Sequence, residues 1–117
     1  MAVCQLTEEI TYRMCTFPVD MRKQITGLQG IVTSELGRYP VAGEAFVFMG
    51  KNRKTVKIIH REGNGITMYV RKLSRGRFKM PSVDAGNGTC AIDYRAFRLL
   101  VLGETSEVDL TVKKHAV

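Results

Sequence analysis

The stretch "TVKIIHREGNGITMYVRKL", residues 55–73, decides the fold that we predict for this chain. Both halves of the stretch are rich in β-branched and aromatic residues, which are typical of strands. Between the halves lie Gly63, Asn64 and Gly65, which adopt positive φ angles more readily than other residues. The stretch therefore predicts a β-hairpin that turns at these three residues.

Side chains alternate between the two faces of a strand, so the hairpin also predicts which residues are buried. One face is expected to hold Val56, Ile58, Ile66, Met68 and Val70. The opposite face is expected to hold Thr55, Lys57, Arg61, Thr67, Tyr69 and Arg71. We therefore predict Ile58 and Met68 in the core, with Lys57 and Tyr69 together on the other face.

The segments before the hairpin predict a strand, a helix and a second strand. Residues 10–15 alternate apolar and polar side chains, and Pro18 ends that pattern. Apolar residues then recur every three or four positions between Asp20, the expected N-cap, and Gly37, the expected stop, as in an amphipathic helix. Residues 44–49 predict the next strand, which the basic loop "KNRK" follows.

The segments after the hairpin predict a loop at residues 82–88 and a helix between Asp93, its N-cap, and Gly103, its stop. The order of strand, helix, three or four strands and helix indicates an α+β fold with an antiparallel β-meander. We expect a single domain over residues 1–117. The pattern shows no βαβ alternation that would predict a parallel sheet.

Positive charge is concentrated in the middle of the chain. The segment from Lys51 to Lys79 holds ten lysines and arginines against one acid, Glu62, whereas the rest of the chain has a net charge of −2. Such a concentration favours a polyanionic partner, because an evenly spread charge serves mainly solubility. Within it, "YVRKLSRGRFKMP", residues 69–81, combines five cations with aromatic side chains and a glycine.

This basic segment predicts a nucleic-acid-binding surface, on which cations follow phosphates while Tyr69 or Phe78 contacts bases or sugars. The candidate residues are Lys57, Tyr69, Arg71, Lys72, Arg75, Gly76, Arg77 and Lys79. Arg22 and Lys23 are either a second binding patch or the solvated start of the first helix. The structural alternatives for the segment are solvated charges and packed aromatic rings, and its composition does not distinguish DNA from RNA.

The sequence shows no G-x-S-x-G motif, no phosphate-binding G-K-[ST] loop and no H-E-x-x-H motif. Asp20, Asp84, Asp93 and Glu104 could form the metal cluster of a nuclease, but two of them are explained as helix N-caps. We therefore expect no catalytic residue, no metal site and no cofactor.

The cysteines Cys4, Cys15 and Cys90 form no C-x-x-C pair. We expect them to be buried as small apolar groups in a reducing cytosol, with a reactive thiol as the alternative. Residues 1–15 show no basic region followed by an apolar run, and no window approaches about 18 apolar residues. The sequence therefore predicts a cytoplasmic protein that does not contact membranes.

Three blocks of the sequence, in this order and spacing, resemble the TnpB-type, Orf2-like accessory protein of the IS sixty-six family of bacterial insertion sequences. They are "VDMRKQITGLQGIV", "FVFMGKNRKTVKIIHREGNG" and "YVRKLSRGRFKMP", and the resemblance covers about residues 10–103. Its DMRK motif, F-x-F pair, lysine strand and glycine turn correspond to Asp20, Met21, Arg22, Lys23, Phe46, Phe48, Lys57, Gly63 and Gly65. Its K-R-L-x-R-G-R-F-x-x-P signature corresponds to Arg71, Lys72, Leu73, Arg75, Gly76, Arg77, Phe78 and Pro81.

This chain departs from the family pattern at Ser74, where the signature usually carries glutamate, and at Met80, where it often carries tryptophan. The resemblance implies a protein that a bacterial mobile element needs for transposition. It also implies a separate, larger transposase that holds the acidic catalytic residues.

We predict a non-enzymatic accessory factor that binds DNA, or a DNA-bound transposase of the same element, through the face bearing Lys57, Arg71, Arg75 and Arg77. The alternative hypothesis is an adaptor whose basic face docks on an acidic patch of the transposase without touching nucleic acid. The expected partners are thus DNA and the transposase, and no particular oligomeric state is predicted.

Overall fold

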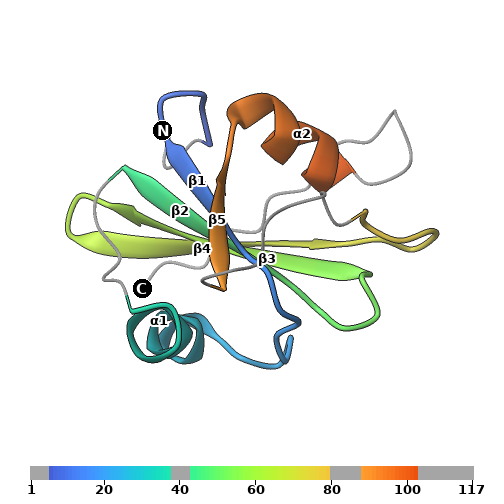
Figure 1. Cartoon of the computed structure of the whole chain (residues 1–117), viewed down its shortest axis with the longest axis horizontal. Coiled ribbons are helices and arrows are strands. Elements are labelled where there is room, and N and C mark those ends of the chain that lie inside the picture. The colour runs from blue at the N-terminus through green and yellow to red at the C-terminus, as the bar shows by residue number, and fades with distance from the viewer. Residues whose placement is uncertain (1–5, 38–42, 80–87, 103–117) are drawn as a thin grey trace.

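The computed structural model describes residues 6–37, 43–79 and 88–102, without the side chains of Cys90 and Leu102. These residues form a five-stranded sheet with one helix packed on each face (Figure 1). In chain order the elements are β1 (Thr11–Cys15), α1 (Ile25–Ser34), β2 (Glu44–Met49), β3 (Thr55–Glu62), β4 (Gly65–Lys72), β5 (Thr89–Ile92) and α2 (Tyr94–Leu102). The predicted α+β class and the predicted order of elements are confirmed, with four strands between the helices.

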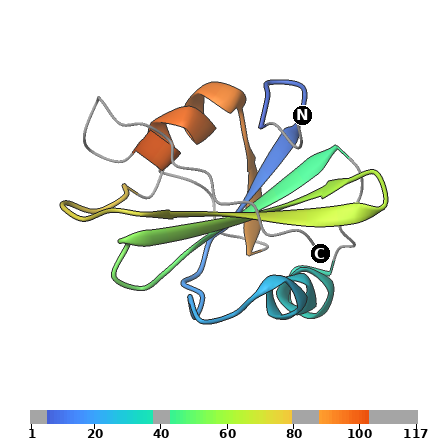
Figure 2. The ribbon, with the colours of Figure 1, turned by 180° about the vertical axis from the view of Figure 1, so that it is seen from behind.

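The sheet has the strand order β4-β3-β2-β1-β5. Strands β2, β3 and β4 form the predicted antiparallel meander, and β5 pairs antiparallel with β1 at the other edge. Strands β1 and β2, however, are parallel, so β1, α1 and β2 form a βαβ unit that the sequence analysis did not predict (Figure 2). A single crossover of this kind gives no repeated strand–helix alternation in the sequence, which is why the pattern missed it.

The hairpin turns where predicted, but its strands pair differently from the prediction. Glu62 pairs with Gly65, and therefore Ile59 pairs with Met68 and Ile58 with Tyr69. Paired residues share a face, so Ile58 and Met68 are both buried as expected but on opposite faces of the sheet. The prediction of one common buried face is wrong, because the two-residue turn pairs odd positions with even ones and because both faces carry a core.

The prediction that Lys57 and Tyr69 share an exposed face is also wrong. Lys57 lies on the α1 side of the sheet and is only 6% exposed. Tyr69 belongs to the core on the α2 side and is only 4% exposed. A sheet covered by helices on both faces leaves no solvated face for either side chain.

The two helices differ in how they begin. In α2, the Asp93 carboxylate accepts a hydrogen bond from the Ala96 amide at 2.7 Å, which confirms the predicted N-cap. Asp20 is not the N-cap of α1, because its carboxylate accepts the Arg22 amide at 2.9 Å in a turn that precedes the helix. Gly37, at φ 65°, follows α1 as predicted, and Gly103 lies outside the described residues.

The cores on the two faces are built from different side chains. On the α2 side, the Tyr12 ring stacks on Phe97 with centroids 3.9 Å apart. On the α1 side, the core includes Cys15, which is free and fully buried as predicted. Burial raises the pKa of the Cys15 thiol to about 11, so this group stays protonated at neutral pH. The Cys4 and Cys90 side chains lie outside the described part.

We predict that Ile58→Ala and Ile59→Ala each lower the free energy of unfolding by about 2–5 kcal/mol, because each empties a packed site on a different face. Arg61→Ala, at an exposed position of the same strand, serves as control and should change it by less than about 0.5 kcal/mol. Urea denaturation measures all three. A large effect at only one isoleucine would contradict the two-sided core.

Candidate nucleic-acid interface

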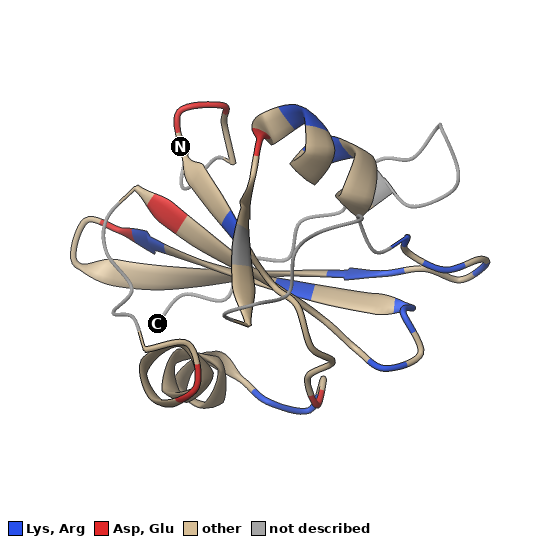
Figure 3. Cartoon of the chain, viewed as in Figure 1, with Lys and Arg blue, Asp and Glu red and all other residues tan. Residues whose placement is uncertain are grey.

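Three loops meet at one end of the sheet. Strand β1 is parallel to β2, and β3 is antiparallel to both β2 and β4, so β1, β2 and β4 all run in the same direction. The loops that follow these three strands therefore leave the sheet at the same end (Figure 3). We call this region the basic end, and its cations are Arg22, Lys23, Lys51, Arg53, Lys54, Lys72, Arg75, Arg77 and Lys79.

The loop between β2 and β3 is a tight turn that exposes its cations. The Gly50 amide donates to the Thr55 carbonyl at 3.1 Å, and the Arg53 amide donates to the Gly50 carbonyl at 3.0 Å. The Asn52 side chain accepts a hydrogen bond from the Lys54 amide at 3.0 Å. Arg53 closes the turn with a φ of 60°, a left-handed conformation that is uncommon for residues other than glycine.

The loop after β4 is tied to this turn by its backbone. The Leu73 amide donates to the Lys54 carbonyl at 2.9 Å, and the Phe78 amide donates to the Arg53 carbonyl at 2.7 Å. The Phe78 side chain is fully buried in the core on the α2 side. The intervening residues therefore arch outward, with Gly76 at φ 73° and its arginine neighbours exposed.

The aromatic contacts predicted for this segment are not available at its surface. Tyr69 and Phe78 were expected to contact bases or sugars, but both rings are buried in the core on the α2 side. The physical reason is that the Phe78 ring anchors the loop in this core, and that Tyr69 lies on the face of the sheet that α2 covers. What the segment exposes is positive charge, from Lys72, Arg75 and Lys79 among others.

The loop after β1 lies against the β2–β3 turn. The Val19 amide donates to the Met49 carbonyl at 3.0 Å, and a Cβ placed on Gly50 would lie 2.7 Å from Met21 Cγ. This contact sets Arg22 and Lys23 beside the β2–β3 turn. The alternative that these two residues form the start of the first helix is wrong, since α1 begins only at Ile25.

Two of the predicted binding residues are buried and form hydrogen bonds that hold neighbouring segments of the chain in place. The Lys57 ammonium donates to the Lys23 carbonyl at 2.7 Å, so this side chain fastens the first loop to β3. The Arg71 guanidinium donates to the Val101 carbonyl in the last turn of α2, where a cation is favourable. Burial lowers the pKa of the Lys57 ammonium, against the opposing effect of Asp20, and burial lowers the pKa of the Arg71 guanidinium.

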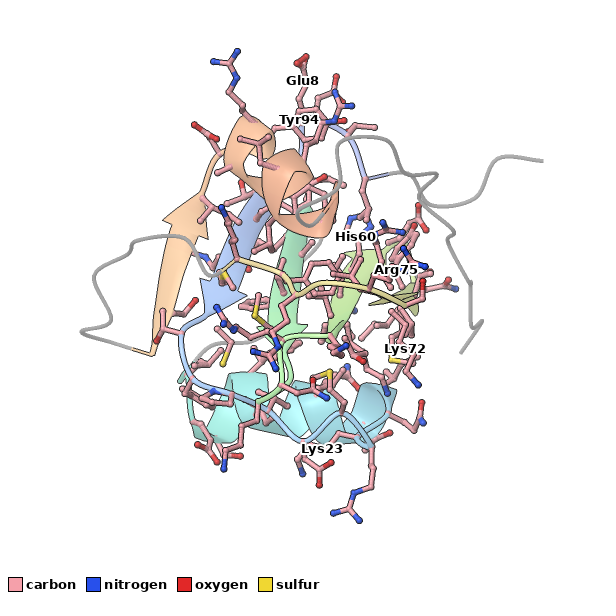
Figure 4. All side chains as sticks on the ribbon, turned by 90° about the vertical axis from the view of Figure 1, so that its right-hand side faces the viewer. Glu8, Lys23, His60, Lys72, Arg75 and Tyr94 are labelled. Atoms are coloured by element: carbon pink, nitrogen blue, oxygen red, sulfur yellow. The ribbon has the colours of Figure 1, made fainter. Side chains whose placement is uncertain are left out.

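The charges of the described residues are strongly polarised. Arg13 pairs with Glu44 at 3.2 Å and Arg22 pairs with Asp20 at 2.8 Å, and neither ion pair involves the loops that follow β2 and β4. Figure 4 looks onto the basic end and shows Lys72 and Arg75 along one side, Lys23 beside α1, and Glu8 at the opposite end of the view. Apart from Asp20, which pairs with Arg22, the charged side chains that the structure describes in these three loops are all positive, and such a surface attracts polyanions.

Sequence reasoning did not select Lys51, Arg53 and Lys54 as site residues, although all three lie in the charged central segment. The signal that could have identified these residues was the predicted antiparallel meander. In an antiparallel meander the turn between the first two strands lies at the same end as the exit of the third strand. Two basic segments that are separated in the sequence are thereby brought together.

The described residues include no group of three or more His, Cys, Asp or Glu side chains that could hold a metal ion. No helix among them is long and apolar enough to cross a membrane. Fold and site thus define the chain as a small α+β protein whose sheet is buried on both faces and whose three loops form one basic end.

The chain belongs to the IS66 Orf2 like protein family, whose model matches residues 10–109. This confirms the resemblance of its three motif blocks and ties the chain to transposition of insertion sequences in an accessory role. No solved structure gives a significant match.

Two relatives come from Sinorhizobium fredii (strain NBRC 101917 / NGR234). Uncharacterized protein y4jC is 33% identical over 90 residues, which cover 77% of this chain and 75% of the relative. Uncharacterized protein y4hO is 34% identical over 73 residues, which cover 62% of this chain and 64% of the relative.

We predict that Gly76→Val lowers the free energy of unfolding by about 1–2 kcal/mol, whereas Gly76→Asn costs clearly less, because asparagine tolerates the left-handed conformation. A Cβ placed on Gly76 would meet no atom within 4 Å, so we expect the difference to reflect backbone conformation. Thermal unfolding of both variants measures it. Equal melting temperatures would show that φ at position 76 is not constrained.

Proposed function

We propose that this protein is a non-enzymatic accessory factor of transposition that binds DNA through the basic end. The observation that carries the proposal is the convergence of three cationic loops at the carboxyl ends of β1, β2 and β4. Cations of separate loops on one surface can contact several phosphates at once, and each contact releases counterions from the nucleic acid.

The composition of the surface supports contact with the phosphate backbone. Proteins that bind single strands without sequence preference stack bases on exposed aromatic rings, yet Tyr69 and Phe78 are buried here. Lysine and arginine contacts to phosphates position a protein on a duplex but carry no direct sequence information. We therefore propose binding to duplex DNA that depends on salt and only weakly on sequence.

The second proposed partner is the transposase of the same element, in the bacterial cytoplasm. A factor bound to the DNA backbone can present its other surfaces to an enzyme on the same DNA. The adaptor hypothesis assigns the basic end to the transposase alone, and the following experiment separates the two.

We expect duplex binding by the isolated protein to weaken with salt, with a slope of log affinity against log salt near −3 or steeper, because at least three phosphate contacts form at once. Replacing Arg75 and Arg77 together by alanine removes two exposed cations of the third loop. This variant should flatten the slope by about two units and leave the melting temperature unchanged, since both side chains are exposed. Fluorescence anisotropy at several salt concentrations measures the slope.

The matched control replaces Arg95 and Arg98 of α2, two exposed cations away from the three loops, and should leave the slope nearly unchanged. No duplex binding by the wild-type protein at low salt would contradict the proposal. An unchanged slope in Arg75→Ala/Arg77→Ala together with lost transposition would assign the basic end to the transposase.

A further inference from the structure

The second loop, after β2, and the third loop, after β4, flank an open hollow of about 400 Å³ that is lined by Arg53, Lys54, Gly76 and Arg77. Three of these residues are cations, the fourth has no side chain, and no carboxylate lines the hollow. We infer that the hollow is a binding site for one phosphate group and that Arg53 is the main determinant of this site. This inference rests on the proposed function as far as the phosphate belongs to DNA.

The walls of the hollow are fixed by the fold. The carbonyls of Arg53 and Lys54 accept the amides of Phe78 and Leu73, so the two loops are joined on both sides of the arch that contains Gly76. The buried Phe78 ring holds the end of that arch in the core. A site held in this way loses little conformational freedom when a ligand binds, which favours affinity.

The conformation of Arg53 suggests that its side chain has a function. Among the described residues, Arg53 is the only one other than glycine with a positive φ, and five glycines occupy the other such positions. Glycine or asparagine would adopt this φ with less strain, so a turn alone would be better served by either. An arginine kept in a disfavoured conformation points to a role for the guanidinium.

The chemistry of the hollow suits a phosphate group. Two guanidinium groups, from Arg53 and Arg77, can each offer parallel N–H donors that match the spacing of phosphate oxygens. Gly76 lines the same hollow and has no Cβ to keep a ligand from the backbone, and the amides of residues 75–77 donate no hydrogen bond within the described part of the chain. Successive amides around a left-handed residue form an anion-binding concavity.

The test compares Arg53→Gly with Lys51→Ala, which removes an exposed cation from the same turn without changing a strained residue. We expect Arg53→Gly to melt at the same or a higher temperature than the wild type and to bind a short duplex about tenfold more weakly. Lys51→Ala should weaken binding by only about twofold to threefold. Arg53→Lys, which keeps the charge but loses the bidentate geometry, should lie between the two.

A second measurement uses inorganic phosphate alone, followed by amide shifts in NMR spectra. We expect shifts at residues 53, 54, 76 and 77 in the wild type and their loss in Arg53→Gly. The inference is overturned if both variants weaken duplex binding equally, if Arg53→Gly melts well below the wild type, or if phosphate moves no amide of the hollow. If the protein binds duplex DNA but Arg53→Gly weakens binding no more than Lys51→Ala, the phosphate site is contradicted and the proposed function is not. If phosphate shifts the amides of the hollow but the protein binds no duplex, the proposed function is contradicted and the phosphate site is supported.

Discussion

Burial of the sheet on both faces governs where this protein can present a binding surface. The core under α1 contains Ile59 and Met68, and the core under α2 contains Ile58 and Tyr69, so the middle of the hairpin is buried on both faces. The two buried cations of the hairpin, Lys57 and Arg71, consequently form hydrogen bonds inside the molecule. Lys57 fastens a loop and Arg71 binds the end of α2, and the exposed charges are left to the loops at the ends of the strands.

The direction of the strands then decides which loops meet. Helix α1 returns the chain to the end of the sheet at which β1 begins, and β2 therefore runs parallel to β1. The meander then gives β4 the same direction. The family motifs acquire physical roles in this arrangement. The DMRK block is the turn that Lys57 holds, the glycine turn closes the hairpin at a positive φ in Gly63, and the R-G-R-F block is an arch anchored by Phe78.

The sequence was sufficient for the class of fold, the order of elements, the hairpin turn and the N-cap at Asp93. It was insufficient for the pairing of the hairpin strands, since periodicity gives the faces of each strand separately and the register depends on the turn and on what covers each face. The parallel pairing of β1 with β2 also had no local signal. It results from packing of α1 across the sheet, which periodicity in one segment does not encode.

The candidate site was predicted in part for the same reason. Exposed cations such as Arg75 and Arg77 were identified by charge density. The contribution of Arg53 required knowledge that two loops are joined by backbone hydrogen bonds between residues 19 and 25 positions apart in the sequence. Such long-range contacts follow from the fold and not from composition.

The central claim is that the three loops act as one DNA-binding surface. It is tested most directly by an NMR titration of the full chain with a short duplex, in which amide shifts are mapped on the structure. We expect shifts that cluster in residues 20–24, 50–54 and 72–79 and are absent from residues 8–9, 62–65 and 93–98. Shifts confined to α2, or spread evenly over the molecule, would contradict it.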